Sequence, residues 1–556
     1  MPEINNTFKI GLCMAGAISA GAYTAGAIDY LIEALEEWQK RKDNNESNTP
    51  RHNVEIPIIG GASAGGMTGI IAASALQDEI EPVKELLGDI MKQQPSNKFY
   101  HTWVDLTDDK MLSILLNTDD ITKNGLQSVL NADFIDKVAE RAVKVSNAST
   151  VDRKYIANNL KVFVTLSNLE GMDFSIAFRS NSYKDKYVVS SYNDYAYFKL
   201  CASENDYTND GWIPLNFKTN LNVDVVKNAA MATGAFPVGL KARILSRGMK
   251  YMNDLEWFKH ITRDANNPFK KDPYNTVNVD GGMINNEPFD KIRELLLGSI
   301  TPQKLQDVQD YDKFDSTVLM IDPFPSETEK FDDSTKLTTI IGNTLGVLVG
   351  QARLKSSLLI DAMDSKKAGQ FLIAPVRYEK KAGGEEISIE GKKAIACGSL
   401  DGFGGFISKE FRIHDYFLGR ANCEKFLRDH FTVPQSTANK IFMNGYSGIT
   451  DKTQFTSKTD GGLQIIPIFT ERRLSLYMPK FSNGKEYPAV TFNEISSYRK
   501  MLKARVEKVI LNISKYSRTQ RMLLWIGAKV VLNAKIADAV IDSVIESLEE
   551  HKLIRK

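Results

Sequence analysis

The sequence is poor in cysteine and histidine and has no excess of charge of either sign. Its 556 residues include four cysteines without a C-x-x-C pair, so neither a zinc site nor a disulfide framework is indicated. The 70 lysines and arginines nearly balance 69 acidic residues, so the net charge is +1. The chain as a whole therefore lacks the strong positive charge that is typical of nucleic-acid-binding proteins. We therefore predict no zinc site, no nucleic-acid partner and a reducing, intracellular setting.

The sequence also lacks a run of 18 or more strongly apolar residues, so it predicts no conventional membrane span. The charge-free stretch 11–28 imitates the apolar region of a signal peptide, but it is mostly Gly, Ala and Ser and no basic cluster precedes it. We therefore expect a cytoplasmic protein rather than a secreted one. The 42% hydrophobic and 25% charged residues are typical of a globular chain with a large core.

Two strand-loop-helix units come first in the chain. Residues 8–14 predict a strand, residues 15–21 a small-residue loop, and the residues from Ala22 onward a helix with apolar side chains at helical spacing. Residues 54–59 predict a second buried strand, and residues 67–76 a second helix. Two such units in succession are typical of a parallel sheet covered by helices.

Later segments extend this pattern. Further elements are expected as strands at 160–166, 174–178, 317–321 and 370–376, as a helix at 337–359, and as a Gly-rich turn region at 398–405. Two polar excursions, 206–222 and 250–274, are candidate lids. We predict a core domain at residues 1–330 and an α-rich C-terminal region with some strands at 331–556, packed on or regulating the core.

The last sixty or so residues are predicted to be helical and basic. Residues 498–535 carry ten lysines or arginines against one acid, Glu507. The apolar side chains of the first helix share one face, at Leu502, Val506, Val509, Ile510 and Ile513. The charges could lie on anionic lipid headgroups, or they could be solvated while the apolar face packs on the core. The second interpretation is favoured, and both remain open.

The first chemical signal is a G-x-S-x-G pattern between the second predicted strand and its helix. It consists of Gly61, Ser63 and Gly65 with alanines between them. A nucleophilic serine sits on such a strained strand-to-helix turn, where only small neighbours avoid a clash. The helix N-terminus adds backbone N–H groups suited to an oxyanion. Ser63 is therefore a candidate nucleophile, and the alternative is a Gly/Ser-rich turn that merely packs closely.

A serine needs a base, and the sequence offers two kinds. In the chain order of α/β-hydrolases the partner would be His414 or His430, although so early a serine does not suit that topology. Asp280 ends an apolar segment before Gly281 and Gly282, where a strand end would place a catalytic carboxylate. The alternative for Asp280 is an ordinary Asp-Gly turn.

The second chemical signal is the small-residue loop at 15–23, which follows the first predicted strand and opens the first helix. Such a loop can present backbone N–H groups to a phosphate or to an oxyanion. The nucleotide interpretation is weak, because no G-K-[ST] follows and the G-x-G-x-x-G spacing is incomplete. We therefore predict no cofactor.

The loop, the G-x-S-x-G turn and the Asp-Gly-Gly turn, in this order, resemble the patatin-like phospholipase family. Two further segments, 21–28 and 229–237, are similar to other parts of that family, and the resemblance covers roughly residues 8–325. It implies a three-layer α/β/α fold with a mainly parallel sheet, lipid acyl hydrolysis, no metal, and a Ser63–Asp280 dyad without histidine. The oxyanion hole would be formed by Gly16, Ala17, Ile18 and Ala64.

The loop departs from the G-G-G-x-R-G pattern of the family. Residues 16–21 have the sequence G-A-I-S-A-G, so two glycines and the arginine are missing. Isoleucine does not take positive φ cheaply, and we expect the loop geometry to differ. Losing one oxyanion donor typically costs about 100- to 1,000-fold in kcat.

Three functional hypotheses follow. In the first, the protein cleaves phospholipid or other ester lipids as a peripheral enzyme, with the inner membrane face as the expected surface. In the second, it is a conventional Ser-His-Asp esterase that uses His414 or His430. In the third, suggested by the altered loop, it is a catalytically silent lipid-binding or scaffold protein of the same shape.

Overall fold

A computed structural model describes most of the chain. The described residues are 6–86, 96–121, 125–146, 151–177, 186–260, 271–298, 301–325, 369–381, 383–469, 477–513 and 533–555. The helix predicted at 337–359 lies outside these residues, as do part of one candidate lid at 261–270 and the basic stretch 514–532.

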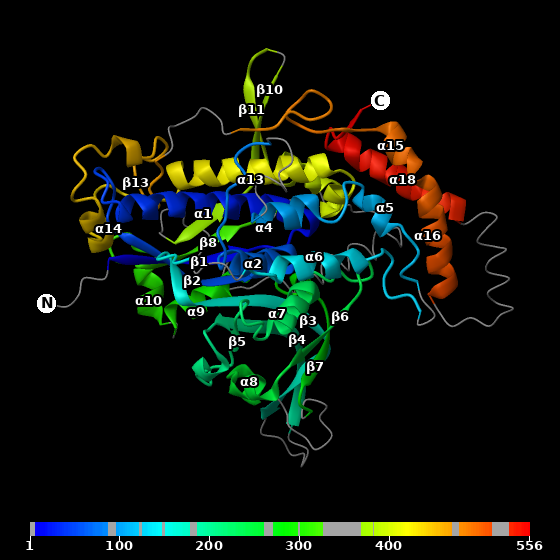
Figure 1. The fold of residues 1–556 in the computed structure, drawn as a ribbon, viewed down its shortest axis with the longest axis horizontal. Coiled ribbons are helices and arrows are strands. Elements are labelled where there is room, and N and C mark those ends of the chain that lie inside the picture. The colour runs from blue at the N-terminus through cyan, green and yellow to red at the C-terminus, as the bar shows by residue number, and fades with distance from the viewer. Residues whose placement is uncertain are drawn as a thin grey trace.

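The described residues form one nine-stranded sheet as the centre of the fold (Figure 1). Its middle is parallel, in the order β3-β2-β1-β8-β9, and β4 joins β3 antiparallel with β5 beyond it. β7 also pairs antiparallel with β3, and β6 pairs with β7. The strands are β1 (Thr7–Met14), β2 (Asn53–Gly61), β3 (Ile156–Ala177), β4 (Lys186–Leu200), β5 (Ile213–Leu215), β6 (Arg243–Arg247), β7 (Tyr274–Asp280), β8 (Ser316–Ile321) and β9 (Gln370–Ile373).

Three of the predicted strands are confirmed as β1, β2 and β8. The segments predicted separately at 160–166 and 174–178 belong, as far as Ala177, to one long strand, β3, and residue 178 lies outside the described residues. It stays continuous because β4 pairs with it on both sides of a register shift between Ser167 and Met172. The strand predicted at 370–376 ends at Ile373.

Helices cover both faces of the sheet. Along β1, Phe8, Ile10, Leu12 and Met14 belong to a core shared with α1, α2, α7 and α13, whereas Cys13 belongs to a second core on the other face. On that face α9 packs against β1, β2 and β8. The helices are α1 (Gly21–Asp43), α2 (Ser63–Ala75), α7 (Val223–Thr233), α9 (Phe289–Leu297) and α13 (Lys409–Asp429). The predicted three-layer α/β/α fold with a mainly parallel sheet is confirmed.

The two candidate lids pack against the sheet in their described parts. Trp212, Met252 and Phe258 are each at most 5% exposed and belong to the second core. The described parts of both excursions therefore pack into the globular fold, and the first contributes β5 to the sheet. They contain β5, α8 (Met249–Asp254) and a short 3-10 helix at Trp257–His260.

The C-terminal region continues the core. β9 extends the sheet beside β8, and α13 runs alongside α1 (Figure 1). Glycine permits this close helix contact, because a Cβ on Gly26 would lie 1.9 Å from the carbonyl oxygen of Tyr416, and one on Gly419 would lie 2.1 Å from that of Tyr23. The division at residue 330 stays a prediction, and the sheet continues past it.

The remaining α-helices and strands of the described structure lie outside the central sheet and the helices named above. They are α4 (Lys98–Tyr100), α5 (Met111–Leu115), α6 (Asp133–Val143), α10 (Pro302–Asp307), α14 (Lys440–Gly445), α15 (Phe492–Ser497), α16 (Arg499–Asn512), α18 (Asn533–Glu550), β10 (Val376–Lys380), β11 (Glu386–Glu390), β12 (Thr432–Val433), β13 (Leu463–Gln464), β14 (Val490–Thr491) and β15 (Ile554–Arg555). The predicted helical C-terminal extension is thus present. Of the helices described, none combines the length and the apolar character that a membrane crossing requires.

The described part of the basic C-terminal segment packs against the protein. In α16, Arg505 is 2% exposed and donates to Asp120 Oδ2 at 2.9 Å and to the carbonyl oxygen of Val129 at 2.7 Å. Leu502 and Val506 are half-buried, while Ile513 is 67% exposed. Within the described residues this favours the packing interpretation over a lipid-facing surface.

His52 makes stability depend on pH. It is fully buried against Trp38 and Phe442, its Nε2–H donates to the carbonyl oxygen of Ile465 at 2.8 Å, and Nδ1 has no partner among the described residues. Burial lowers the pKa of His52 to about 4. Between that value and an unfolded pKa of about 6.5 the unfolded state binds more protons, so stability falls as the pH drops through this window.

We expect this histidine to remove up to about 3 kcal/mol of unfolding free energy between about pH 7 and pH 4. Urea unfolding at several pH values measures the slope, with His52→Gln as the non-titrating comparison that keeps an N–H donor. Equal slopes in the two proteins would contradict the assignment.

Candidate active site

Ser63 lies on the strand-to-helix turn that the sequence predicts, after β2 and at the first residue of α2. Its φ is +49°, a strained value for a residue with a side chain. The flanking glycines are required by close backbone approach. A Cβ on Gly61 would lie 2.6 Å from the carbonyl carbon of Gly65, and a Cβ on Gly65 would lie 2.2 Å from the carbonyl oxygen of Met14.

Asp280 meets this serine. It is the last residue of β7, and its Oδ2 accepts a 2.6 Å hydrogen bond from Ser63 Oγ. Its Oδ1 accepts the N–H of Gly282 at 2.7 Å, which sets the orientation of the carboxylate. Both side chains of the pair are only 5% exposed. A carboxylate in this position can take the hydroxyl proton as Oγ attacks an electrophile.

The sheet brings the aspartate to the serine. Asp280 pairs with Leu166 of β3, and Ser167 Oγ donates to the Asp280 carbonyl oxygen at 2.8 Å. Gly281 is needed for this approach, because a Cβ there would lie 2.1 Å from the carbonyl oxygen of Thr165. The Asp-Gly-Gly turn is therefore held against β3 on the same sheet that carries the serine elbow.

The loop after β1 lies directly against Ser63. A Cβ on Gly16 would lie 3.0 Å from Ser63 Cβ. Ile18 begins the short 3-10 helix η1 (Ile18–Ala20) and has a φ of +48°. The isoleucine therefore adopts the left-handed conformation despite its steric cost.

The predicted oxyanion donors differ in their availability. The N–H groups of Ala17, Ile18 and Ala64 have no hydrogen-bond partner within the described ranges. The N–H of Gly16 donates to the carbonyl oxygen of Asn286 at 3.3 Å. In this structure the Gly16 N–H is therefore engaged by Asn286. The oxyanion role of all four residues stays a prediction.

Two contacts at the site were missed from sequence. Thr233, the last residue of α7, accepts the N–H of Ser63 on its Oγ1 at 2.9 Å. Ala235, in the same segment, accepts the N–H of Asp280 at 2.9 Å. The sequence did indicate that segment 229–237 is similar to part of the family. That similarity does not reveal that the segment contacts both Ser63 and Asp280.

Asn286 is the other missed residue. Its Oδ1 would lie 2.3 Å from a Cβ on Gly16 and 2.5 Å from a Cβ on Gly282, so it sits between the loop and the aspartate turn. No sequence pattern indicated it, because its role follows from the meeting of two distant segments.

The candidate histidines lie elsewhere. His414 is fully buried and its Nδ1 is hydrogen-bonded to Asp415 Oδ1 at 2.7 Å. His430 is exposed at the end of α13, where its ring stacks on Phe426. The hydrogen bonds at Ser63 thus come from Asp280 and Thr233, without a histidine.

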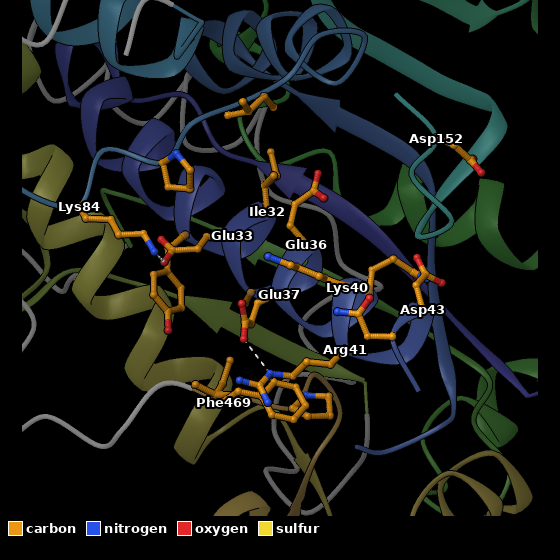
Figure 2. A pocket seen from close by; sticks show the side chains of 18 residues that line it. Ile32, Glu33, Glu36, Glu37, Lys40, Arg41, Asp43, Lys84, Asp152 and Phe469 are labelled. Atoms are coloured by element: carbon orange, nitrogen blue, oxygen red, sulfur yellow. Dashed lines mark hydrogen bonds and ion pairs between the residues drawn. The ribbon is translucent and has the colours of Figure 1, made fainter. Parts of the chain in front are cut away.

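A large pocket is lined by side chains of α1 and of other segments, among them Lys84, Asp152 and Phe469 (Figure 2). Its volume is about 730 Å³, and its lining contains neither Ser63 nor Asp280. Several of its charged side chains are paired, as in Glu37–Arg41 at 2.7 Å and Glu33–Lys84 at 2.6 Å. In the part of the chain that the structure describes, no group of three or more His, Cys, Asp and Glu side chains is arranged to hold a metal.

Known proteins resemble this chain to different extents. A family model described as "Patatin-like phospholipase" matches residues 12–292, a range that contains Ser63 and Asp280. The chain is 29% identical over 524 residues to "Uncharacterized protein y4iI" of Sinorhizobium fredii (strain NBRC 101917 / NGR234), which covers 86% of this chain and 73% of that protein. The crystal structure of VipD from Legionella pneumophila aligns over 97% of this chain and 91% of that one at 10% identity, with a TM-score of 0.17 that carries no argument about the fold.

Proposed function

Because the chain belongs to the patatin-like phospholipase family, we propose that it is a serine acyl hydrolase that cleaves fatty acyl esters of membrane lipids through Ser63 and Asp280. The observation that carries this proposal is the 2.6 Å hydrogen bond from Ser63 Oγ to Asp280 Oδ2. It joins a serine on a strained turn to a carboxylate whose other oxygen accepts the N–H of Gly282 at 2.7 Å. Both lie inside the matched range.

In the proposed reaction Asp280 accepts the hydroxyl proton while Ser63 Oγ attacks the ester carbonyl carbon. The carbonyl oxygen becomes an oxyanion, for which the donors are the N–H groups of Ala17, Ile18 and Ala64, which have no partner among the residues that the structure describes. The carbon–oxygen bond to the alcohol then breaks, and the proton on Asp280 passes to the leaving lysolipid or alcohol. An acyl ester on Ser63 remains.

Water completes the cycle. Asp280 takes one proton from a water molecule, whose oxygen attacks the acyl carbon. The tetrahedral species is held by the same N–H groups. It collapses to release the fatty acid, and Ser63 regains its proton from Asp280. Each step uses groups of this chain and water, and the substrate is a phospholipid or related ester lipid met at a membrane surface.

Covalent labelling tests the nucleophile. We expect a fluorophosphonate probe to modify wild-type protein on the peptide containing Ser63, and the Ser63→Ala variant to lose both labelling and release of fatty acid from phospholipid vesicles. The matched control is Ser74→Ala, since Ser74 is a buried serine of the same helix that donates to the carbonyl oxygen of Ala142 at 2.8 Å.

Two results would count against the proposal. One is labelling that survives in the Ser63→Ala variant. The other is wild-type protein that binds vesicles without releasing fatty acid and leaves Ser63 unmodified, which would support the silent lipid-binding alternative.

A further inference from the structure

A glycine-rich segment of the C-terminal region, residues 396–406, contacts the loop beside the nucleophile. Ser19, the second residue of η1, donates its hydroxyl to the carbonyl oxygen of Gly402 and accepts the N–H of Gly405 at 2.9 Å. Ser19 is 2% exposed. One buried hydroxyl therefore joins two parts of the chain that are 383 positions apart in sequence.

The glycine-rich segment 396–406 packs tightly against the loop at Ile18 and Ser19. Gly402 has a φ of +100°, and a Cβ there would lie 3.3 Å from Cβ of Ile18. A Cβ on Gly405 would lie 2.6 Å from Ser19 Oγ and 2.7 Å from Cys397 Sγ. The segment thus contacts both the strained isoleucine and the serine that follows it.

The segment is itself held in place by α13. Arg412 is 1% exposed, and its Nη1 donates to the carbonyl oxygen of Gly405 at 2.5 Å while its Nε donates to that of Val104 at 2.8 Å. Asp415 accepts the N–H groups of Ala396 and Cys397, each at 2.8 Å. Because α13 packs along α1, these anchors belong to the buried core of the protein.

A strained backbone persists only where its surroundings hold it. Ile18 has the positive φ that an isoleucine disfavours, and the hydrogen-bonded Ser19 is its direct neighbour. The preceding peptide groups carry the N–H donors of Ala17 and Ile18, which have no partner in the described structure. The contacts that fix the position of Ser19 therefore also fix the position of the Ala17 and Ile18 N–H groups.

We infer that Ser19 is a positioning residue for the oxyanion hole, through which the glycine-rich segment at 396–406 keeps the N–H groups of Ala17 and Ile18 beside Ser63. The inference rests on the proposed function. It accounts for a loop that lacks the glycines and the arginine of the family pattern, because contacts from the C-terminal region replace what the loop's own residues do not supply.

The test is the Ser19→Ala variant in the full-length protein. We expect kcat for fatty acid release to fall about 10- to 100-fold with KM changed less than about twofold, since the loss concerns an interaction with the transition state. Affinity for a trifluoromethyl ketone lipid analogue, which forms an oxyanion adduct with a serine, should fall by the same factor. Affinity for a non-hydrolysable ether phospholipid should not change.

The matched control is Ser457→Ala. Ser457 is also a buried serine, and it donates to the carbonyl oxygen of Asp429 at 2.9 Å and accepts the N–H of Thr459 at 3.1 Å. We expect it to lower thermal stability while kcat per labelled site and ketone affinity stay at wild-type values. Gly405→Ala tests the same contact from the other side if Ser19→Ala does not fold.

Wild-type kcat and ketone affinity in soluble Ser19→Ala or Gly405→Ala would overturn the inference and leave the proposed function standing. A wild-type protein with no turnover and an unreactive Ser63 would overturn both.

Discussion

The Asp280→Asn variant is expected to release fatty acid roughly 1,000-fold more slowly than the wild type, at nearly unchanged stability. Asparagine has the same shape as aspartate, and its amide oxygen can keep the bond that Oδ1 accepts from the Gly282 N–H at 2.7 Å. The amide nitrogen then occupies the position of Oδ2, where it donates to Ser63 Oγ and cannot accept a proton. The initial rate of fatty acid release and a urea unfolding curve measure the two quantities.

The chain contains a matched control for this change. Asp460 also precedes two glycines, its Oδ1 accepts the N–H of Gly462 at 2.8 Å, and its Oδ2 accepts the hydroxyl of Thr432 at 2.7 Å. Asp460→Asn removes a carboxylate from the same kind of turn away from Ser63, so its kcat should stay within about twofold of wild type. Equal losses in the two variants would remove Asp280 from the proposed mechanism.

The largest effect on stability is expected from Arg420→Met in α13. Arg420 forms ion pairs with Asp29 and Glu33 of α1, and Asp29 is fully buried. Burial raises the pKa of Asp29 even though the guanidinium beside it acts in the opposite direction. Without Arg420 the carboxylate is left uncompensated, and we expect the free energy of unfolding to fall by about 3–5 kcal/mol in urea titrations.

A double variant tests whether the lost stability comes from the uncompensated charge of Asp29 or from the loss of the contact between α13 and α1. Asp29→Asn combined with Arg420→Met removes both members of the buried pair, so it should regain a large part of the lost stability. Lys84→Met removes the exposed partner of Glu33 and should change stability by less than about 1 kcal/mol. A single Arg420→Met variant as stable as Lys84→Met would show that the buried pair does not hold α13 on α1.

The fold was predictable where the signal is local and periodic. β1 and β2 alternate or cluster apolar residues over a few positions, and each is followed by a helix with apolar residues at helical spacing. β3 was predicted as two strands, because the polar residues between its halves look like a break in the sequence. Pairing with β4 on both sides of the shift overrides that local preference.

The two Asp-Gly-Gly turns show the limit of motifs. Both aspartates accept the N–H two residues later and a hydroxyl from a distant residue, Ser63 in one case and Thr432 in the other. The local sequence therefore produces the same hydrogen bond from a glycine N–H to the aspartate carboxylate twice. Only the position of β7 beside β3 places one of the two carboxylates at a strained serine.

The amino-acid sequence by itself determined the strained turn at Ser63, the Asp-Gly-Gly turn and the alternation of layers, because each depends on residues a few positions apart. Only the tertiary structure decided that Thr233 holds the Ser63 N–H, that Asn286 occupies the Gly16 N–H, and that Gly402 and Gly405 hold Ser19. These contacts join residues 170 or more positions apart, and they form because the sheet and its two helix layers bring the segments together as they bury their apolar faces.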